Sequence, residues 1–364
     1  MKRALLVAGM AAAMAVGATT AANASTPRQT ATSVTGTEIG PSNSWVVAVN
    51  DHGDVAGSTA INVGSEFLTH GFFWHAGTLT DLGFLPGGNT TDTYAVNENG
   101  EVVGDSGVYG GTMHAFAWSG GKMTDLGSLG GDSYAFAING KGQIAGISVN
   151  AAGRTLAVVW CDGKMTTLPS LGGPLSYPTA EDAAGQVVGY AQTASGTERA
   201  VLWTNGKIVD LGPGEALGVN ADGQVLVMDD IAGQPTSAYV WQNGKKTMLP
   251  AGVSQVNGLN EKGSVVGYYT PAGATQSHGF VWRNGKLTDL GADFPLAIDS
   301  AGRILAYTPD ANDNSIGLVL DQGKTITLAP APESVVYPAV ISDSGLVGGI
   351  TGNEAAIWQL PTGD

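Results

Sequence analysis

The chain has 364 residues, of which 55 are glycine, and its formal net charge is −15. This excess of acidic residues disfavours binding to nucleic acid or to an anionic membrane surface. The single cysteine, Cys161, excludes an internal disulfide, so the packing of the core must hold the fold.

The first 24 residues have the features of a secretory signal peptide. Lys2 and Arg3 precede an apolar run over residues 4–16, and Ala22-Asn23-Ala24 is a small-x-small cleavage site. We therefore expect Sec-type cleavage before Ser25 and a secreted, extracellular or periplasmic protein. No later run reaches the roughly 18 apolar residues of a membrane-spanning helix. Residues 25–364 are expected to form one soluble domain.

Two motifs recur eight times along this domain. The first is an aliphatic residue, then Asn, Asp or Ser, two free positions, Gly, one free position and two small or aliphatic residues. Its copies begin at Val49, Val96, Ile138, Glu181, Val219, Leu259, Ile298 and Ile341. The second is a short apolar run that ends at Trp74, Trp118, Trp160, Trp203, Trp241, Trp282, Leu320 and Trp358.

Both motifs are typical of tight turns between short strands. In the copy at Val96, the side-chain oxygen of Asn97 can cap its own turn, and Gly100 can supply a positive φ. Runs rich in Val, Ile, Phe and Trp lie between the turns and predict four strands per unit. Because the units are 38 to 47 residues long, we predict an all-β fold, a β-propeller of eight four-stranded blades. Seven blades are the alternative, if the unit that ends at Leu320 is not a blade.

The two ends of the domain predict how the ring closes. The eighth unit ends after its third strand, and residues 32–40 resemble the missing fourth strand. We therefore expect this N-terminal strand to join the last blade, which leaves no open sheet edge between the first and last blades.

The repeated phrase "HAFAW", followed by "GKMTDLGSLGGDSYAFAIN", resembles the extracellular bacterial repeats called the HAF family, after residues such as His114-Ala115-Phe116. Close variants begin at His70 and His278, whereas the fifth, seventh and eighth units lack both the His and the "LGG" turn. The resemblance implies export and a propeller-like fold, and it implies no activity. From the residues themselves, we expect the His to bond to a nearby loop and the Trp to fill the space between sheets. We expect the Asp of "TDLG" to cap a turn or to lie on the outer edge strand.

One position at the start of each unit's first strand is rich in aromatic residues. In a propeller the first strand is innermost, so these side chains would surround one mouth of a central channel, where they could stack on sugars or apolar ligands. The alternative is that they wedge between neighbouring blades. The five aromatic residues at this position are the predicted binding residues: Trp45, Tyr134, Tyr177, Phe294 and Tyr337.

Two further features depart from the repeat. Glu181 stands where the other seven units have an aliphatic residue, which makes it a candidate catalytic acid or base unless Arg199 or Arg154 pairs with it. The loop after residue 309 resembles a calcium loop, with oxygen ligands offered by Asp310, Asn312, Asn314 and Asp321. Its sixth position is Ser315 in place of the usual Gly.

Two functions of different classes remain open from the sequence. The first is a monomeric binding module without a cofactor, whose ligand is an extracellular glycan, a cell-wall fragment or a protein. The second is an extracellular lyase or hydrolase that acts on a polymer through the loop face of the propeller. The sequence favours the binding module, because it shows no catalytic triad, no pair of catalytic carboxylates and no metal-ligand spacing.

Overall fold

The computed structural model describes residues 32–63, 66–229, 236–310, 314–330 and 335–361, and all the regular structure in them is β-strand. The predicted signal peptide lies outside these residues. Nor do they contain a helix long and apolar enough to cross a membrane.

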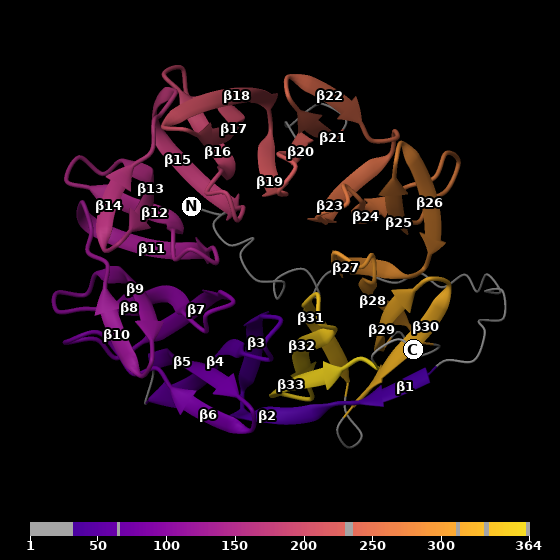
Figure 1. Ribbon diagram of the computed structural model, residues 1–364, viewed down its shortest axis with the longest axis horizontal. Helices are drawn as coiled ribbons and strands as arrows, with labels where there is room; N and C mark the ends of the chain where they lie inside the picture. Colours follow the sequence, from indigo (N-terminus) through magenta and orange to yellow (C-terminus); the bar gives the residue numbers. More distant parts are fainter. Residues whose placement is uncertain (1–31, 64–65, 230–235, 311–313, 331–334, 362–364) are drawn as a thin grey trace.

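Within the described residues, the strands form eight groups of four antiparallel strands (Figure 1). The third and fourth groups are joined into one eight-stranded sheet by a short parallel pairing of Thr155 with Leu175. The first strands of the groups, which lie nearest the common centre, are β3 (Ser44–Val49), β7 (Thr91–Val96), β11 (Gly130–Ile138), β15 (Gly172–Glu181), β19 (Glu215–Val219), β23 (Val253–Leu259), β27 (Phe294–Ile298) and β31 (Val336–Ile341). The second strands are β4 (Val55–Val63), β8 (Val102–Gly107), β12 (Ile144–Asn150), β16 (Val187–Thr193), β20 (Val225–Asp229), β24 (Val265–Tyr269), β28 (Ile304–Pro309) and β32 (Leu346–Thr351).

The outer two strands of each group complete the pattern. The third strands are β5 (Glu66–His75), β9 (Met113–Ser119), β13 (Thr155–Cys161), β17 (Glu198–Thr204), β21 (Ser237–Gln242), β25 (His278–Arg283), β29 (Ser315–Asp321) and β33 (Glu354–Gln359). The fourth strands are β6 (Thr78–Asp81), β10 (Lys122–Asp125), β14 (Lys164–Thr167), β18 (Lys207–Pro213), β22 (Lys245–Met248), β26 (Lys286–Gly291), β30 (Lys324–Ala329) and, in the last group, β2 (Thr37–Ser42).

The N-terminal segment divides between two groups. Strand β2 pairs antiparallel with β33, so the N-terminal segment does supply the fourth strand of the last group. The preceding strand β1 (Thr32–Thr35) instead pairs in parallel with β30. The prediction of a single strand over residues 32–40 is therefore wrong for its first half. In Figure 1, β2 runs along the outer side of β33, close to the first group.

The predicted turn chemistry is present. In the first group, the Asn50 side-chain oxygen accepts hydrogen bonds from the backbone amides of His52 and Asp54, at 3.0 and 2.8 Å. Gly100 of the second group has the expected positive φ of 72°. The side-chain amide of the same Asn also links neighbouring groups, a role that the sequence did not predict. Such bonds run from Asn50 to the Asn97 carbonyl, from Asn97 to Asn139, from Asn139 to Asp182, from Asn220 to Asn260 and from Asn260 to Asp299.

A second regularity lies in the first strand of every group. Each pairs with the second strand through a register shift at the same place, so that one residue bulges out of the pairing. The bulged residues are Val47, Tyr94, Phe136, Thr179, Leu217, Asn257, Leu296 and Ala339. The bulge of the backbone therefore recurs in every group, whereas the side chain at the bulge differs from group to group.

The core consists of separate apolar clusters between neighbouring groups. In one of them, Val103 and Ala115 of the second group pack against Ala135, Val158 and Trp160 of the third. Trp160 is 1% exposed, and its indole N–H donates to the Leu126 carbonyl of the preceding group at 2.9 Å. The prediction that the Trp residues fill the space between sheets is confirmed.

Candidate functional site

All five predicted binding residues lie on first strands and at the same register. Each is paired across the sheet with a residue of the second strand. The pairs are Trp45 with Ser58, Tyr134 with Ile147, Tyr177 with Tyr190, Phe294 with Tyr307 and Tyr337 with Ile350. Four of the five side chains are half-buried, and Tyr337 is exposed.

Two of these residues belong to a continuous row of rings that spans three groups. Phe136 stacks on Tyr134 and on Tyr177, with ring centroids 6.2 and 4.8 Å apart. Tyr177 in turn stacks on Tyr190 at 5.5 Å, and Tyr94 lies 5.6 Å from Phe136 at the other end. We call these five residues the aromatic wall. Sequence reasoning missed Tyr94 and Phe136, because both are bulged residues, and it missed Tyr190, which lies on a second strand.

The other predicted binding residues lie apart from the wall. Phe294 stacks on Tyr307 at 5.3 Å and meets the edge of Tyr268 at 5.5 Å, in a second and smaller cluster. Trp45 and Tyr337 make no ring contact within the part of the chain that the structure describes. The five predicted residues therefore do not form one aromatic ring of side chains, and only Tyr134 and Tyr177 are brought together, through Phe136.

Three carboxylates lie at the Tyr94 end of the wall. Asp92 and Asp105 are paired across β7 and β8, and Asp132 precedes Tyr134 by two residues on β11. Asp105 is 1% exposed, and its Oδ1 has no hydrogen-bond partner. Burial raises its pKa to about 7; the Tyr94 hydroxyl, which donates to this carboxylate, opposes the shift, and the charges of Asp92 and Asp132 add to it. Burial likewise raises the pKa of Asp92.

The phenol groups of the wall remain protonated hydrogen-bond donors at neutral pH. Burial raises the pKa of Tyr134 to about 12, with an added contribution from the negative charges of Asp132 and Asp105. Burial also raises the pKa of Tyr190 to about 12. The wall therefore offers hydroxyl donors beside a group of carboxylate acceptors.

Glu181 is the last residue of β15, whereas Tyr177 lies in the middle of that strand. Glu181 lies four positions beyond Tyr177, about 13 Å along an extended strand, so the two side chains do not form one site. Its Oε2 accepts hydrogen bonds from Gln143 and Asn139 of the preceding group, at 3.0 and 3.4 Å, and its Oε1 has no partner. Burial raises its pKa to about 8.

The predicted partners of Glu181 bond elsewhere. Arg199 donates to Asp210 at 3.0 Å, and Arg154 donates to the Gly173 carbonyl at 2.6 Å. The prediction that one of them could neutralise Glu181 is therefore wrong. Each arginine has a nearer acceptor, Arg199 on the adjacent strand of its own sheet and Arg154 on the first strand of the next group.

The candidate calcium ligands do not converge. Asp310 and Asn314 form a local turn, in which the Asn314 amide nitrogen donates to Asp310 Oδ1 at 2.9 Å. Asp321 lies at the far end of β29, six residues beyond Ser315, which is about 20 Å along an extended strand. Asn312 lies outside the described residues. A single calcium loop that contains Asp321 is therefore wrong, because the segment continues as a strand.

The repeated His and Asp residues bond to each other. His114 lies 3.0 Å from Asp125, and the same pair recurs as His70 with Asp81 and as His278 with Asp289. Each Asp also caps its own turn, as the sequence predicted; Asp125 accepts the Gly127 amide at 2.7 Å. The expected bond from the His to a neighbouring loop is thus a bond to the outermost strand of its own group.

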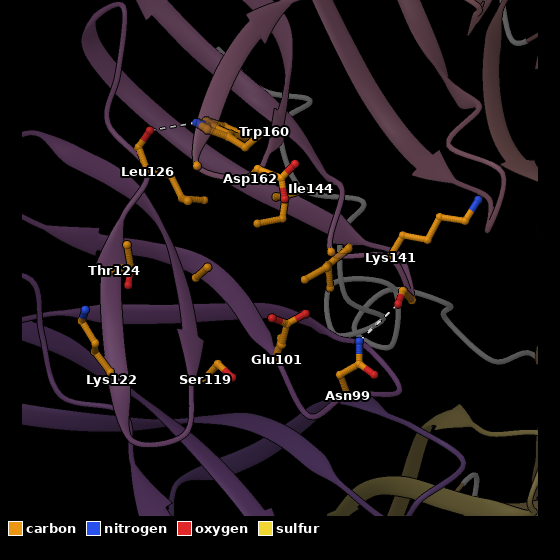
Figure 2. Close-up of a pocket in the computed structure, with 15 residues that line it drawn as sticks. Asn99, Glu101, Ser119, Lys122, Thr124, Leu126, Lys141, Ile144, Trp160 and Asp162 are labelled. Atoms are coloured by element: carbon orange, nitrogen blue, oxygen red, sulfur yellow. Dashed lines mark hydrogen bonds between the residues drawn. The ribbon is translucent and has the colours of Figure 1, made fainter.

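Two surface hollows lie between neighbouring groups, away from the aromatic wall. One has a volume of about 560 Å³ and lies between the turns of the second and third groups; Glu101 points towards its middle and Trp160 lies at its edge (Figure 2). The other has a volume of about 680 Å³ and is lined by Tyr337, Asp310 and Asn314, among others.

Comparison with known proteins identifies the fold as a β-propeller. No protein-family model matches the chain, and no curated protein matches its sequence. The structure of Chaetomium thermophilum Sqt1 bound to the N-terminus of the ribosomal protein L10 has a TM-score of 0.55 and 14% identity, over 90% of this chain and 99% of that one. The β-propeller domain of the Trilobed protease from Pyrococcus furiosus has a TM-score of 0.50 and 8% identity, over 80% and 99%.

Peptidases also share this fold over part of their length. Dipeptidyl peptidase 4 of Porphyromonas gingivalis has a TM-score of 0.51 and 10% identity, over 82% of this chain and 56% of that chain. The chain therefore matches little more than half of this peptidase. At such identities the likeness establishes the fold alone.

Proposed function

We propose that the chain is a binding module that holds a peptide segment of another protein against the aromatic wall. The observation that carries this proposal is the row of five touching rings, supplied by four strands of three groups. The same backbone arrangement recurs in all eight groups, whereas the row of five rings does not recur among the described residues. A surface built by variation on a constant scaffold is the usual arrangement of a binding site.

The geometry of the rings favours a peptide over a sugar. A sugar stacks on an open ring face, whereas Phe136 and Tyr177 each already stack on two neighbouring rings. The wall instead presents hydroxyl groups and carboxylates, which suit the hydrogen-bonding groups of a peptide. Sqt1, which has a similar fold, was solved with a protein N-terminus bound. A glycan or cell-wall fragment is thus the less favoured of the expected ligands.

The enzymatic alternative has less support in this geometry. Glu181, the candidate acid or base, has its carboxyl group enclosed between two groups of strands and bonded to Gln143 and Asn139. It lies four positions along β15 from Tyr177, the wall residue of the same strand.

We also propose the setting in which the module works. The eight groups of strands act as the blades of one closed ring, in which β2 joins the first and last groups by pairing with β33. Residues 1–24 direct export and are removed. The repeats are extracellular repeats of the HAF type, which the phrase "HAFAW" resembles. The protein acts as a monomer without a cofactor.

A matched pair of variants tests the proposed site. Tyr177 and Phe294 occupy the same position of the repeat, and each stacks on its cross-strand tyrosine, at 5.5 and 5.3 Å. The purified protein is screened against a peptide library and a glycan array, and the best ligand is measured by calorimetry. We expect a peptide ligand whose affinity falls at least tenfold in Tyr177→Leu and is unchanged in Phe294→Leu. Equal losses in both variants, or binding to glycans alone, would refute the proposal.

A further inference from the structure

Asp105 is a buried carboxylate whose bonding is incomplete. It is 1% exposed; the Tyr94 hydroxyl donates to it, and its Oδ1 has no partner. Leaving a buried charged oxygen without a partner costs several kcal/mol, as an order of magnitude. Protonation, favoured by the raised pKa of about 7, or a positively charged partner compensates such a cost.

The surroundings add further negative charge. Asp92 is the cross-strand partner of Asp105, so both side chains project from the same side of the sheet. Strand β8 packs against β11, which contributes Asp132 and Tyr134, and the charge of Asp132 acts on Asp105. None of the three carboxylates forms a salt bridge with any of the described residues.

The repeat does not require this arrangement. The position of Asp105 is occupied in the other groups by residues that carry no charge: Ser58, Ile147, Tyr190, Met228, Tyr268, Tyr307 and Ile350. The fold is built at those seven places without a carboxylate. Asp105 therefore does not serve the scaffold that all the groups share.

We propose that Asp105, with Asp92 and Asp132, binds a primary ammonium group of the peptide that lies along the aromatic wall. A compact cation with three N–H donors suits carboxylates supplied by three neighbouring strands. Asp92 and Asp105 are a cross-strand pair, and Asp132 already accepts the Met113 backbone amide at 3.0 Å, which leaves its second oxygen for the cation. The rings of Tyr94 and Tyr134 beside them add the attraction of aromatic rings for a cation. The ammonium group belongs to the N-terminus or to a lysine side chain of the ligand. This inference rests on the proposed peptide-binding function and specifies its chemistry.

Three peptides of one sequence distinguish the two sources of the ammonium group. The sequence is a ligand selected in the peptide screen. One form has a free N-terminus and norleucine in place of lysine, the second is N-acetylated with one lysine, and the third is N-acetylated with norleucine. Affinities are measured by calorimetry at constant salt and pH. We expect one of the two charged peptides to bind at least tenfold more tightly than the uncharged third peptide.

A pair of variants then assigns the preference to Asp105. Asp105→Asn keeps the shape of the side chain and removes its charge, so it should abolish the preference for the charged peptide. Asp162→Asn removes the same charge from an exposed turn residue whose φ of 50° suits asparagine, and it should leave the preference intact. Asp92→Asn is a second test, with an expected loss of at least threefold, and circular dichroism checks that each variant is folded.

Each outcome bears on one proposal. If the uncharged peptide binds as tightly as the charged ones, or if Asp105→Asn keeps the preference, the ammonium site is overturned. It is also overturned if Asp162→Asn loses the preference equally, since the effect would then be one of net charge. If one of these negative results is obtained and the uncharged peptide still loses affinity in Tyr177→Leu, the proposed function holds while the ammonium site is overturned.

Discussion

Asp182 and Asp299 occupy the turn position at which most groups have an asparagine, and the same substitution is expected to have opposite effects at the two sites. The asparagines donate to a carbonyl of the next group, for example from Asn220 to the Asn260 carbonyl at 3.1 Å. Asp182 has no such donor, and its buried Oδ2 has no partner. Asp299 is also buried, but its Oδ2 accepts a hydrogen bond from Arg303 at 2.5 Å.

Asp182→Asn should therefore stabilise the protein. It removes an unpartnered buried carboxylate oxygen, and the new amide can donate to the Asn220 carbonyl, as Asn139 donates to the carbonyl of residue 182. One hydrogen bond gained contributes about 1 kcal/mol, and one unpaired buried polar group removed contributes about 1–3 kcal/mol. Together these contributions predict a gain of about 2–4 kcal/mol in the free energy of unfolding.

Asp299→Asn should destabilise the protein by about 2 kcal/mol, because it weakens a charge-assisted bond and leaves Arg303 without its partner. Chemical denaturation followed by tryptophan fluorescence measures both variants at one pH and one salt concentration. A loss of stability in Asp182→Asn, or changes of the same sign in both variants, would refute the role assigned to the asparagine bonds between groups.

Three further changes test the packing. Glu181→Gln should leave the free energy of unfolding unchanged near pH 4 and raise it near pH 8 by about 1–3 kcal/mol. Burial raises the pKa of Glu181 in the folded state from 4.5 to about 8, so ionisation of Glu181 destabilises the native protein progressively between those pH values. Denaturation at a series of pH values measures the difference. Trp160→Phe removes the indole N–H that bonds to Leu126 and should cost about 1–3 kcal/mol, more than Trp282→Phe, whose indole makes no such bond among the described residues. Deleting residues 32–42 leaves the edge of β33 unpaired, so we expect aggregation on light scattering, and an unchanged monomer would contradict the pairing with β2.

The fold was predictable because its signals are local and repeated. Asn97 and Gly100 define a turn whose geometry needs those residues, and eight copies make the pattern unmistakable. The predicted location of the fourth strand of the last group was also correct in part, since β2 pairs with β33. The pairing of β1 with β30 was not predictable, because a short polar strand carries no signal that selects its neighbour.

The site was only partly predictable. Tyr134 and Tyr177 were found because they occupy one position of the first strand. Tyr94 and Phe136 were missed because they occupy the bulge, and an alternating pattern cannot show a shift in register. The sequence did contain a signal for Asp105. One residue in each unit lies on the second strand five positions after the glycine of the turn motif, and Asp105 is the only carboxylate among these eight residues. That comparison needs the register of the second strand, which the turn motif already fixes.

Residues that recur in a repeat protein and residues that break the repeat call for different explanations. The recurring Trp, Asn and His side chains are accounted for by contacts that hold the groups together. Glu181, Asp182 and Asp105 break the repeat, and each has a buried oxygen without a partner. If all three were no more than defects of packing, their neutral replacements would raise stability and change no binding. Asp105 is the one that lies beside the aromatic wall, so a loss of ligand preference confined to Asp105→Asn would separate a functional carboxylate from two structural ones.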